Sequence, residues 1–376
     1  MKVAVFYDFL QTIGGGEKVA LTLAKHLGAD LITTDADPDL AARAGFPGVT
    51  VIDLGRLRRR PPMKQLDATT KFGRGRFPGY DFHIIVGNWA VYAAKHHRPN
   101  LYYCLTPTRM FFDQRDAVLG RLRPGTRTLA RPWIRVHRSM DKRAVSHCDR
   151  IVAISGVVQR RVREYYGRDA AIVYPPVDTS RFRFERVGDA WLAVSRLYPE
   201  KRIDLLLDIF RRLPDEKLVV AGGHAQGDLA ERYVAGLRPP PNVTLLGEVA
   251  EDALLSLYAT CRGLIAIATD EDFGLTPVEA MAAGKCVIAA DEGGYRETVV
   301  EGRTGYLLRP TAEAFATRIQ SLDDSTLRAM RHDCVAQARK FDESVFLQKI
   351  RALVVGVDTV KTEGTASRAL WRNPPS

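Results

Sequence analysis

Short apolar runs alternate along the chain with stretches of helical spacing. The run KVAVFY at residues 2–7 is rich in β-branched and aromatic residues, and a glycine-rich turn separates it from EKVALTLAKHL, which has helical spacing. Similar strand-like runs follow at LITT, VTVIDL, FHIIVG, LYYCL and DRIVAI. Continuous apolar strands separated by helices are typical of a parallel sheet that helices cover on both faces. The pattern therefore predicts an α/β lobe with a doubly wound sheet.

The same alternation begins again after a proline pair, Pro175 and Pro176. Strand-like runs follow at AWLAVS, KLVVAGG, NVTLLG, GLIAIAT and KCVIAA, and the helical stretch IDLLLDIFRRL lies after the first of them. At about 100–200 residues per domain, the length also favours two domains. We predict an N-terminal domain at residues 1–173 and a C-terminal domain at residues 174–345. A helix and tail at 346–376 are expected to pack back towards the first domain.

The charge of the chain lies mainly in its first half. The composition, with 46% hydrophobic and 26% charged residues, is that of a globular protein and excludes a disordered or fibrous chain. Residues 1–150 contain 25 Lys and Arg against 13 Asp and Glu, while the whole chain has a net charge of +11. The first lobe is therefore the side that would meet an anionic partner, such as a phosphorylated substrate, an anionic lipid or a nucleic acid.

Cysteine usage and hydropathy exclude several classes. The cysteines are odd in number, far apart and without C-x-x-C spacing, so we expect neither disulfides nor a zinc site. No apolar run approaches the ~18 residues of a membrane span, and the N-terminal run is too short for a signal peptide. We predict a cytoplasmic protein. The cysteines are Cys104, Cys148, Cys261, Cys286 and Cys334.

The segment TDEDFGLTPVE, at residues 269–279, carries the most informative chemistry. It lies between an apolar strand and a short helix, where a parallel sheet binds ligands and a helix N-terminus attracts phosphate. Glu271 and Glu279 could accept hydrogen bonds from hydroxyls. Alternatively, Thr276 and Glu279 form a capping box with Pro277 at the first helical position. The capping box explains Glu279 but not the acidic run at 270–272, and both interpretations stay open on the residues alone.

A second loop, SRLYPEKR, places two cations at the end of another strand. Arg196 and Lys201 could hold a leaving diphosphate, the arginine through two parallel hydrogen bonds and the lysine as a point charge. For an isolated arginine and lysine, a solvated charged loop is the more common interpretation.

Together these segments resemble the retaining glycosyltransferases of family 4. The spacing of Glu271 and Glu279 is similar to the E-x7-E signature of that family, with the FGL turn at 273–275 and PVEAMAAG following. YPPVDTSRF, NVTLLGEV and EGGYRETVVEGRTGYLL look like the same family. The resemblance covers nearly the whole chain and is sharpest from Ile172 to Pro310.

The resemblance implies a GT-B fold, in which two Rossmann-like doubly wound domains face each other across a cleft. It also assigns roles to individual residues, and it implies a retaining reaction by front-side attack that needs no metal. The implied catalytic residues are Glu271, Arg196 and Lys201. The implied donor-binding residues are Glu279, Asp272, Phe273, Gly274, Leu275, Thr276 and Val249. The implied acceptor and phosphate loop residues are Gly14, Gly15, Gly16 and Arg109.

Within the family, the chain is most similar to the mannosyltransferase-like group. EDFGLTPVEAMAAGK, the YPPVD segment and TPTRMFFD suggest this group, which implies transfer of mannose from GDP-mannose to a glycan or polyprenyl-linked acceptor in polysaccharide or glycolipid synthesis. Relatives often read C-H-T-P where this chain has Leu105 in place of the histidine. A UDP-sugar-dependent glucosyl- or N-acetylhexosaminyltransferase is therefore the alternative within the family.

Two basic stretches in the first lobe indicate an anionic surface or substrate. Residues 55–76 carry eight Lys and Arg against one acidic residue, and their prolines and glycines predict a mobile basic loop. Residues 121–143 interleave apolar side chains with arginines and could lie at a membrane interface. We expect peripheral association with the inner face of the plasma membrane. A plain basic surface and a nucleic-acid-binding module are the alternatives, although no nucleic-acid motif accompanies the charge and no such partner is expected.

Overall fold

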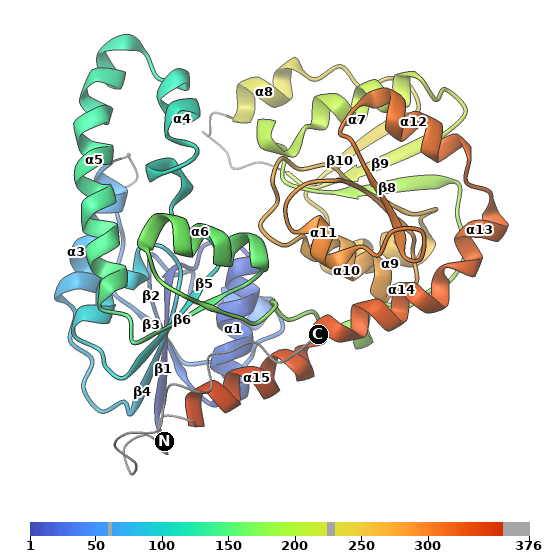
Figure 1. The fold of residues 1–376 in the computed structure, drawn as a ribbon. Helices are drawn as coiled ribbons and strands as arrows, with labels where there is room; N and C mark the ends of the chain where they lie inside the picture. The colour runs from blue at the N-terminus through green and yellow to red at the C-terminus, as the bar shows by residue number, and fades with distance from the viewer. Residues whose placement is uncertain (59–61, 224–229, 356–376) are drawn as a thin grey trace. The chain divides into compact units, whose positions relative to one another are not determined.

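The computed structural model describes residues 1–58, 62–223 and 230–355 (Figure 1). These residues form two compact units, one of Met1–Tyr174 with the chain from Phe346 on, and one of Pro175–Val345. The chain therefore crosses from the first unit to the second between Tyr174 and Pro175, at the proline pair.

The first unit is built on a seven-stranded parallel sheet in the order β3-β2-β1-β4-β5-β6-β7. The strands are β1 (Val3–Phe9), β2 (Asp30–Thr34), β3 (Val51–Asp53), β4 (Phe82–Val86), β5 (Asn100–Cys104), β6 (Arg150–Ala153) and β7 (Ala171–Ile172). The helices are α1 (Gly15–Leu27), α2 (Leu40–Arg43), α3 (Met63–Arg74), α4 (Arg115–Arg121), α5 (Pro124–Ser146) and α6 (Gly156–Tyr166), with 3-10 turns η1 (Ala90–Lys95) and η2 (Arg109–Phe111).

The second unit has a six-stranded parallel sheet in the order β10-β9-β8-β11-β12-β13. The strands are β8 (Ala190–Val194), β9 (Lys217–Ala221), β10 (Val243–Gly247), β11 (Leu264–Ala266), β12 (Val287–Ala290) and β13 (Gly305–Leu308). The helices are α7 (Ile203–Arg211), α8 (Ala230–Gly236), α9 (Glu251–Thr260), α10 (Leu275–Ala282), α11 (Tyr295–Thr298), α12 (Ala312–Gln320), α13 (Asp324–Ala329) and α14 (Arg331–Ala338), and α15 (Glu343–Val355) begins here and continues into the first unit. Its 3-10 turns are η3 (Thr179–Arg181), η4 (Pro199–Lys201) and η5 (Arg339–Phe341).

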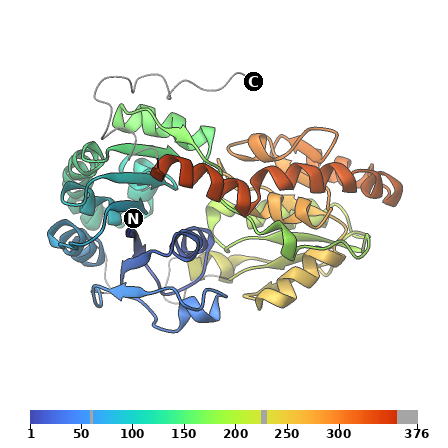
Figure 2. The same cartoon turned by 90° about the horizontal axis from the view of Figure 1, so that it is seen from below.

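The predicted fold class is confirmed, because both units are doubly wound α/β sheets of Rossmann type. Helices lie on both faces of each sheet (Figures 1 and 2). Every residue of β4, β5 and β12 is accordingly buried, as continuous apolar strands require. In each sheet the strand order reverses beside the first strand of the unit, between β1 and β4 and between β8 and β11. Such reversal points are where ligands bind in open α/β sheets.

The last helix, α15, begins in the second unit, and from Phe346 on it belongs to the first (Figure 2). The Phe346 ring packs edge-on against Tyr103, with 5.6 Å between ring centroids. The guanidinium of Arg150 donates a hydrogen bond to the Leu353 carbonyl at 2.6 Å. The tail beyond residue 355 lies outside the described residues.

The predicted mobile basic loop at 55–76 is wrong for most of its length. Residues Met63–Arg74 form α3, which buries Phe72 completely against the first unit. Asp67 accepts hydrogen bonds from both Nε and Nη2 of Arg58, so part of the positive charge is neutralised. A segment with one apolar face and no proline after residue 62 folds as a helix despite its charge. Residues 59–61 lie outside the described part.

The second basic stretch, 121–143, falls mainly within the 23-residue helix α5. Ile134 is buried, whereas Leu129, Val136 and Met140 are exposed. None of the helices in the described part of the chain combines the length and the apolar character that crossing a bilayer would require.

Candidate active site

Two loops of the second unit meet at the carboxyl ends of neighbouring strands. β8 and β11 are parallel and adjacent, with Leu192 opposite Leu264. The loop after β8 leads through η4 into α7, and the loop after β11 leads into α10. The Thr269 N–H donates a hydrogen bond to the Glu200 carbonyl at 2.8 Å, which joins the two loops. Adjacency of the strands therefore brings together segments that are about seventy residues apart in sequence.

Lys201 and Glu271 form an ion pair where these loops meet. The Lys201 Nζ lies 2.7 Å from the Glu271 Oε2, and the two side chains are 29% and 21% exposed. An ion pair that is partly shielded from water is weakened less by salt than a fully exposed pair. The structure thus places together two of the three residues that the family resemblance assigns to catalysis.

Glu292 holds the two residues that immediately flank this pair. Its carboxylate binds the Arg202 guanidinium at 3.0 and 3.1 Å and accepts a hydrogen bond from the Asp270 N–H at 3.3 Å. Arg202 and Asp270 have φ angles of 51° and 48°, in the left-handed backbone region that residues other than glycine rarely adopt. One carboxylate therefore stabilises two strained backbone positions, each next to a member of the ion pair.

The turn after β12 supports the Glu271 backbone. The Gly294 N–H donates to the Glu271 carbonyl at 2.7 Å. A Cβ at Gly293 would lie 2.4 Å from that carbonyl oxygen, and a Cβ at Gly294 would lie 2.4 Å from the Phe273 Cα. Both positions require glycine because the two loops pack backbone against backbone.

The start of α10 corrects the capping-box interpretation. The helix begins at Leu275 after Gly274, whose φ is 90°, and no side chain caps it. The Glu279 carboxylate instead accepts a hydrogen bond from the Tyr258 hydroxyl at 2.6 Å. Burial raises the pKa of that hydroxyl well above its usual range. Because the helix starts two residues earlier than predicted, Thr276 lies inside the first turn and its side chain cannot act as the N-cap.

The remaining donor-side residues lie along the same end of this sheet. Arg196 follows β8 directly and is exposed, and among the described residues its guanidinium forms no ion pair. Phe273 is buried and its ring lies 5.4 Å from that of Phe341, while Asp272 is half-buried. Val249 follows β10, the edge strand of the sheet, so β9 lies between its strand and β8.

The predicted glycine loop opens helix α1 in the first unit. Gly14 is the N-cap, Gly15 begins the helix, and the Gly14 N–H donates to the Glu17 carboxylate at 3.0 Å. A Cβ at Gly16 would lie 2.6 Å from the Tyr7 hydroxyl and 2.9 Å from Leu105. Leu105, which replaces the family histidine, therefore contacts the glycine loop.

Arg109, the other predicted residue of the first unit, lies in η2. Its guanidinium forms an ion pair with Asp113 at 2.6 Å. The arginine side chain is 16% exposed.

Sequence reasoning missed several side chains that hold loops of the two units in place. Asp8, at the end of β1, accepts hydrogen bonds from the N–H groups of Asn88, Trp89 and Ala90 at 2.7–2.9 Å. Burial raises the pKa of Asp8 to about 6. An aspartate within an otherwise apolar strand is a usable signal. Tyr258 and Glu292 give no such signal, because Tyr258 lies in helix α9 and Glu292 in the turn after β12, where such side chains are common.

The expectation that the chain needs no metal stays a prediction. In residues 1–58, 62–223 and 230–355, no three His, Cys, Asp or Glu side chains are grouped as metal ligands would be. The positive charge at the ends of β8 and β11 comes from Arg196, Lys201 and Arg202.

Comparisons with known proteins bear on both units. The family model of glycosyl transferases group 1 matches residues 188–341. The model of glycosyltransferase family 4 matches residues 13–181. Each model falls almost entirely within one unit, and together they span most of the described chain.

Two known proteins illustrate the sequence similarity. D-inositol 3-phosphate glycosyltransferase of Nocardia farcinica is 30% identical over 277 residues, 62% of this chain and 61% of that protein. Alpha-1,3/1,6-mannosyltransferase ALG2 of Dictyostelium discoideum is 32% identical over 192 residues, 44% of this chain and 45% of that protein. The chain thus spans about half of the length of these relatives.

A solved structure extends the similarity to the whole fold. HepE of Anabaena in complex with UDP has a TM-score of 0.71 at 20% identity, covering 95% of this chain and 100% of HepE. HepE has also been solved with UDP-glucose. This likeness concerns the fold, and it agrees with the two parallel-sheet units described above.

Proposed function

Because this chain belongs to the family 4 glycosyltransferases and has their GT-B fold, we propose that it transfers a sugar from a nucleotide-sugar donor to a glycan or lipid-linked acceptor. The donor residues would be those of the second unit. The acceptor would be handled by the first unit, with Gly14, Gly15, Gly16 and Arg109 in its phosphate loop.

The observation that carries the proposal is the ion pair of Lys201 and Glu271 beside the start of α10. It combines a cation for the donor diphosphate, a carboxylate for sugar hydroxyls and the N-terminus of an eight-residue helix. The cations Arg196 and Lys201 would stabilise the negative charge that develops as the nucleoside diphosphate leaves. Glu279, held by Tyr258, would accept hydrogen bonds from the ribose hydroxyls.

The proposed reaction keeps the anomeric configuration. The acceptor hydroxyl attacks C1 of the donor sugar from the face that the diphosphate leaves. A donor phosphate oxygen takes the hydroxyl proton as the bond between C1 and that diphosphate breaks. Glu271 orients the sugar rather than forming a bond to it. Because side-chain cations neutralise the leaving group, we expect turnover in the presence of a metal chelator.

GDP-mannose is the proposed donor, and mannose is the sugar transferred. The similarity to a mannosyltransferase favours this sugar. The alternative is a UDP-sugar, because the fold is shared with HepE, which was solved with UDP-glucose.

The basic first half and the exposed Leu129, Val136 and Met140 of α5 support association with an anionic membrane surface.

Release of nucleoside diphosphate from a panel of GDP- and UDP-sugars tests the proposal directly. The purified chain, without acceptor and with a chelator, should release GDP from GDP-mannose slowly. Release from a UDP-sugar alone would support glycosyltransferase activity and exclude GDP-mannose as the donor. No release from any donor, with or without an acceptor extract, together with DNA binding that nucleotide-sugars do not compete, would favour the nucleic-acid alternative.

The variant Glu271→Gln tests the site. It removes the charge that holds Lys201 and weakens hydrogen bonds to the sugar, so turnover should fall about 100-fold while nucleoside diphosphate affinity is nearly kept. Lys201→Ala should lose both turnover and affinity. Glu313→Gln, which makes the same change on the exposed surface of α12, is the control. Full activity of Glu271→Gln would refute the assignment.

A further inference from the structure

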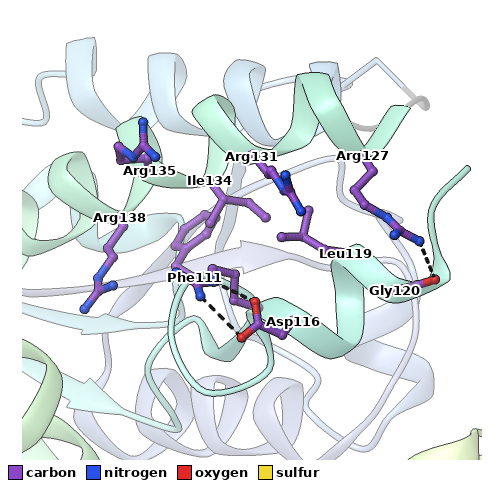
Figure 3. A pocket seen from close by; sticks show the side chains of 10 residues that line it. Phe111, Asp116, Leu119, Gly120, Arg127, Arg131, Ile134, Arg135 and Arg138 are labelled. Carbon is purple, nitrogen blue, oxygen red and sulfur yellow. Dashed lines mark hydrogen bonds and ion pairs between the residues drawn. The ribbon is translucent and has the colours of Figure 1, made fainter. Parts of the chain in front are cut away.

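A cavity of about 520 Å³ lies between α4 and α5 in the first unit (Figure 3). The apolar side chains of Phe111, Leu119 and Ile134 contribute to its wall, together with Gly120. The rest of the lining is charged, with a single acid, Asp116. The arginines of the lining, which we call the arginine groove, are Arg115, Arg127, Arg131, Arg135 and Arg138.

Helix geometry aligns four of these arginines on one side of α5. Arg127, Arg131 and Arg135 are four residues apart, and Arg138 follows three residues later, so these positions lie on the same side of the helix. At 1.5 Å per residue, the row is about 16 Å long. The exposed Leu129, Val136 and Met140 fall at other positions of the helical period. The groove is therefore separate from the apolar stripe of the same helix.

Few of the guanidinium groups are neutralised. Arg115 pairs with Asp116 at 3.0 Å, and Arg138 lies 5.0 Å over the Phe112 ring. Arg131 and Arg135 form no ion pair or hydrogen bond with any other described residue. Five arginines against one aspartate leave a strong positive potential in one hollow.

Arg127 is held in place at one end of the groove. Its terminal nitrogen donates to the carbonyls of Gly120 and Leu122 at 3.2 and 3.3 Å, which fixes the side chain against the end of α4. Its Nε is buried and has no hydrogen-bond partner among the described residues. The charge of this side chain is therefore held at one end of the groove.

The chemistry of the groove selects a phosphate-bearing ligand. A guanidinium binds phosphate through two parallel hydrogen bonds, and neighbouring arginines on the helix are close enough to hold a diphosphate between them. Phe111, Leu119 and Ile134 are almost fully buried beneath the arginines, so the accessible part of the groove is the part that would hold the phosphates. The proposed donor residues Arg196, Lys201 and Glu271 all belong to the second unit, so the groove is available to the other substrate.

We propose that the arginine groove binds the diphosphate of a lipid-linked acceptor. The identity of this ligand as the acceptor rests on the proposed glycosyltransferase function. Binding of a diphosphate to the groove does not depend on that function. The two can therefore be tested separately.

Binding of inorganic diphosphate and of farnesyl diphosphate to the full chain tests the groove. Arg131→Gln/Arg135→Gln should weaken farnesyl diphosphate binding about tenfold or more, because two charged hydrogen-bond donors are lost. The control Lys95→Gln/Arg143→Gln removes the same charge from exposed positions of the first unit outside the cavity and should change binding less than about twofold. Diphosphate that binds at the donor site should contribute equally to the binding measured in both variants.

The outcomes distinguish binding in the groove from a general charge effect and from a membrane contact. Equal losses in the two double variants would show a general charge effect, and no loss in either would show that the groove is not the site. Loss of binding to phosphatidylglycerol vesicles by the groove variant, with farnesyl diphosphate affinity kept, would identify a membrane contact instead. Each of these three results overturns the proposal. Nucleoside diphosphate release without acceptor should be unchanged in both variants, and its absence in the unmodified chain would count against the proposed function alone.

Discussion

At the scale of single residues, charge holds the candidate active site together. Lys201 and Glu271 neutralise each other, and Glu292 holds the strained backbone on each side of them through Arg202 and Asp270. Neither strained residue is a glycine, so the left-handed conformations persist only because their partners stabilise them. Glu292 is thus a positioning residue that does not itself need to contact the donor.

Glu292→Gln should therefore lower turnover more than binding. Without the carboxylate charge, Arg202 is left half-buried and unpaired, and the loops that carry Lys201 and Glu271 lose their shared anchor. We expect kcat to fall about 10- to 100-fold, since small misplacements of reacting groups have effects of this size. Nucleoside diphosphate affinity should change less than about threefold.

Steady-state kinetics and calorimetry on the same preparation separate these two effects. Glu313→Gln again serves as the control, and Glu292→Asp should restore part of the turnover because it keeps the charge. Equal losses of kcat and affinity in Glu292→Gln would show that Glu292 merely keeps the unit folded.

At the scale of elements, helix α5 combines features that oppose each other. One side carries the arginine groove, and the buried side contains Asp141. Burial raises the pKa of Asp141 to about 7, although the hydrogen bond from the Tyr166 hydroxyl, at 2.7 Å, acts in the opposite direction. A carboxyl group inside an amphipathic helix makes the packing of α5 sensitive to pH.

The free energy of unfolding should fall as the pH rises from the ordinary pKa of Asp141 to its raised pKa in the folded chain. An unfolded chain ionises Asp141 near its ordinary pKa of 3.8, whereas the folded chain keeps the proton until about pH 7. The folded state therefore binds more protons between these values, and stability decreases with pH across that window. Asp8, with a pKa of about 6, acts in the same direction.

Asp141→Asn should reduce this pH dependence. The unfolding midpoint in denaturant, compared at pH 5 and pH 8, should shift less in the variant than in the unmodified chain. Asp116→Asn is the control, because Arg115 lowers the pKa of that exposed carboxyl and it does not titrate in this range. An unchanged pH dependence in Asp141→Asn would contradict the assignment.

At the scale of the whole molecule, the proposed chemistry is divided between the two units. The residues expected to bind the donor follow β8, β10 and β11 in the second unit. The glycine loop, Arg109 and the arginine groove belong to the first unit. Each unit also buries its own apolar core, so a ligand that contacts one unit should stabilise mainly that unit.

Hydrogen exchange with and without nucleoside diphosphate measures this division. We expect protection to be largest in the segments 195–202 and 268–279, because their backbone lies at the proposed phosphate site. Farnesyl diphosphate should instead protect 111–138. The reverse pattern, with nucleotide protection greatest around α4 and α5, would show that the donor binds in the first unit.

The sequence alone determined the fold class and most of the candidate site. Continuous apolar strands occur where a sheet is buried on both faces, and the spacing of Glu271 and Glu279 around a glycine turn is local information that tertiary packing does not change. The ion pair of Lys201 and Glu271 was implicit in that pattern, since both residues follow strands that end at the same edge of a parallel sheet.

Only the tertiary structure decided which distant side chains complete these features. Three features depend on surfaces that meet only after folding. These are the hydrogen bond from Tyr258 to Glu279, the anchoring role of Glu292 and the helix at Met63–Arg74. The arginine groove depends likewise on the packing of α4 against α5. Charge counts along a sequence show how many cations a segment has, but burial and neighbouring elements determine which of them face one cavity.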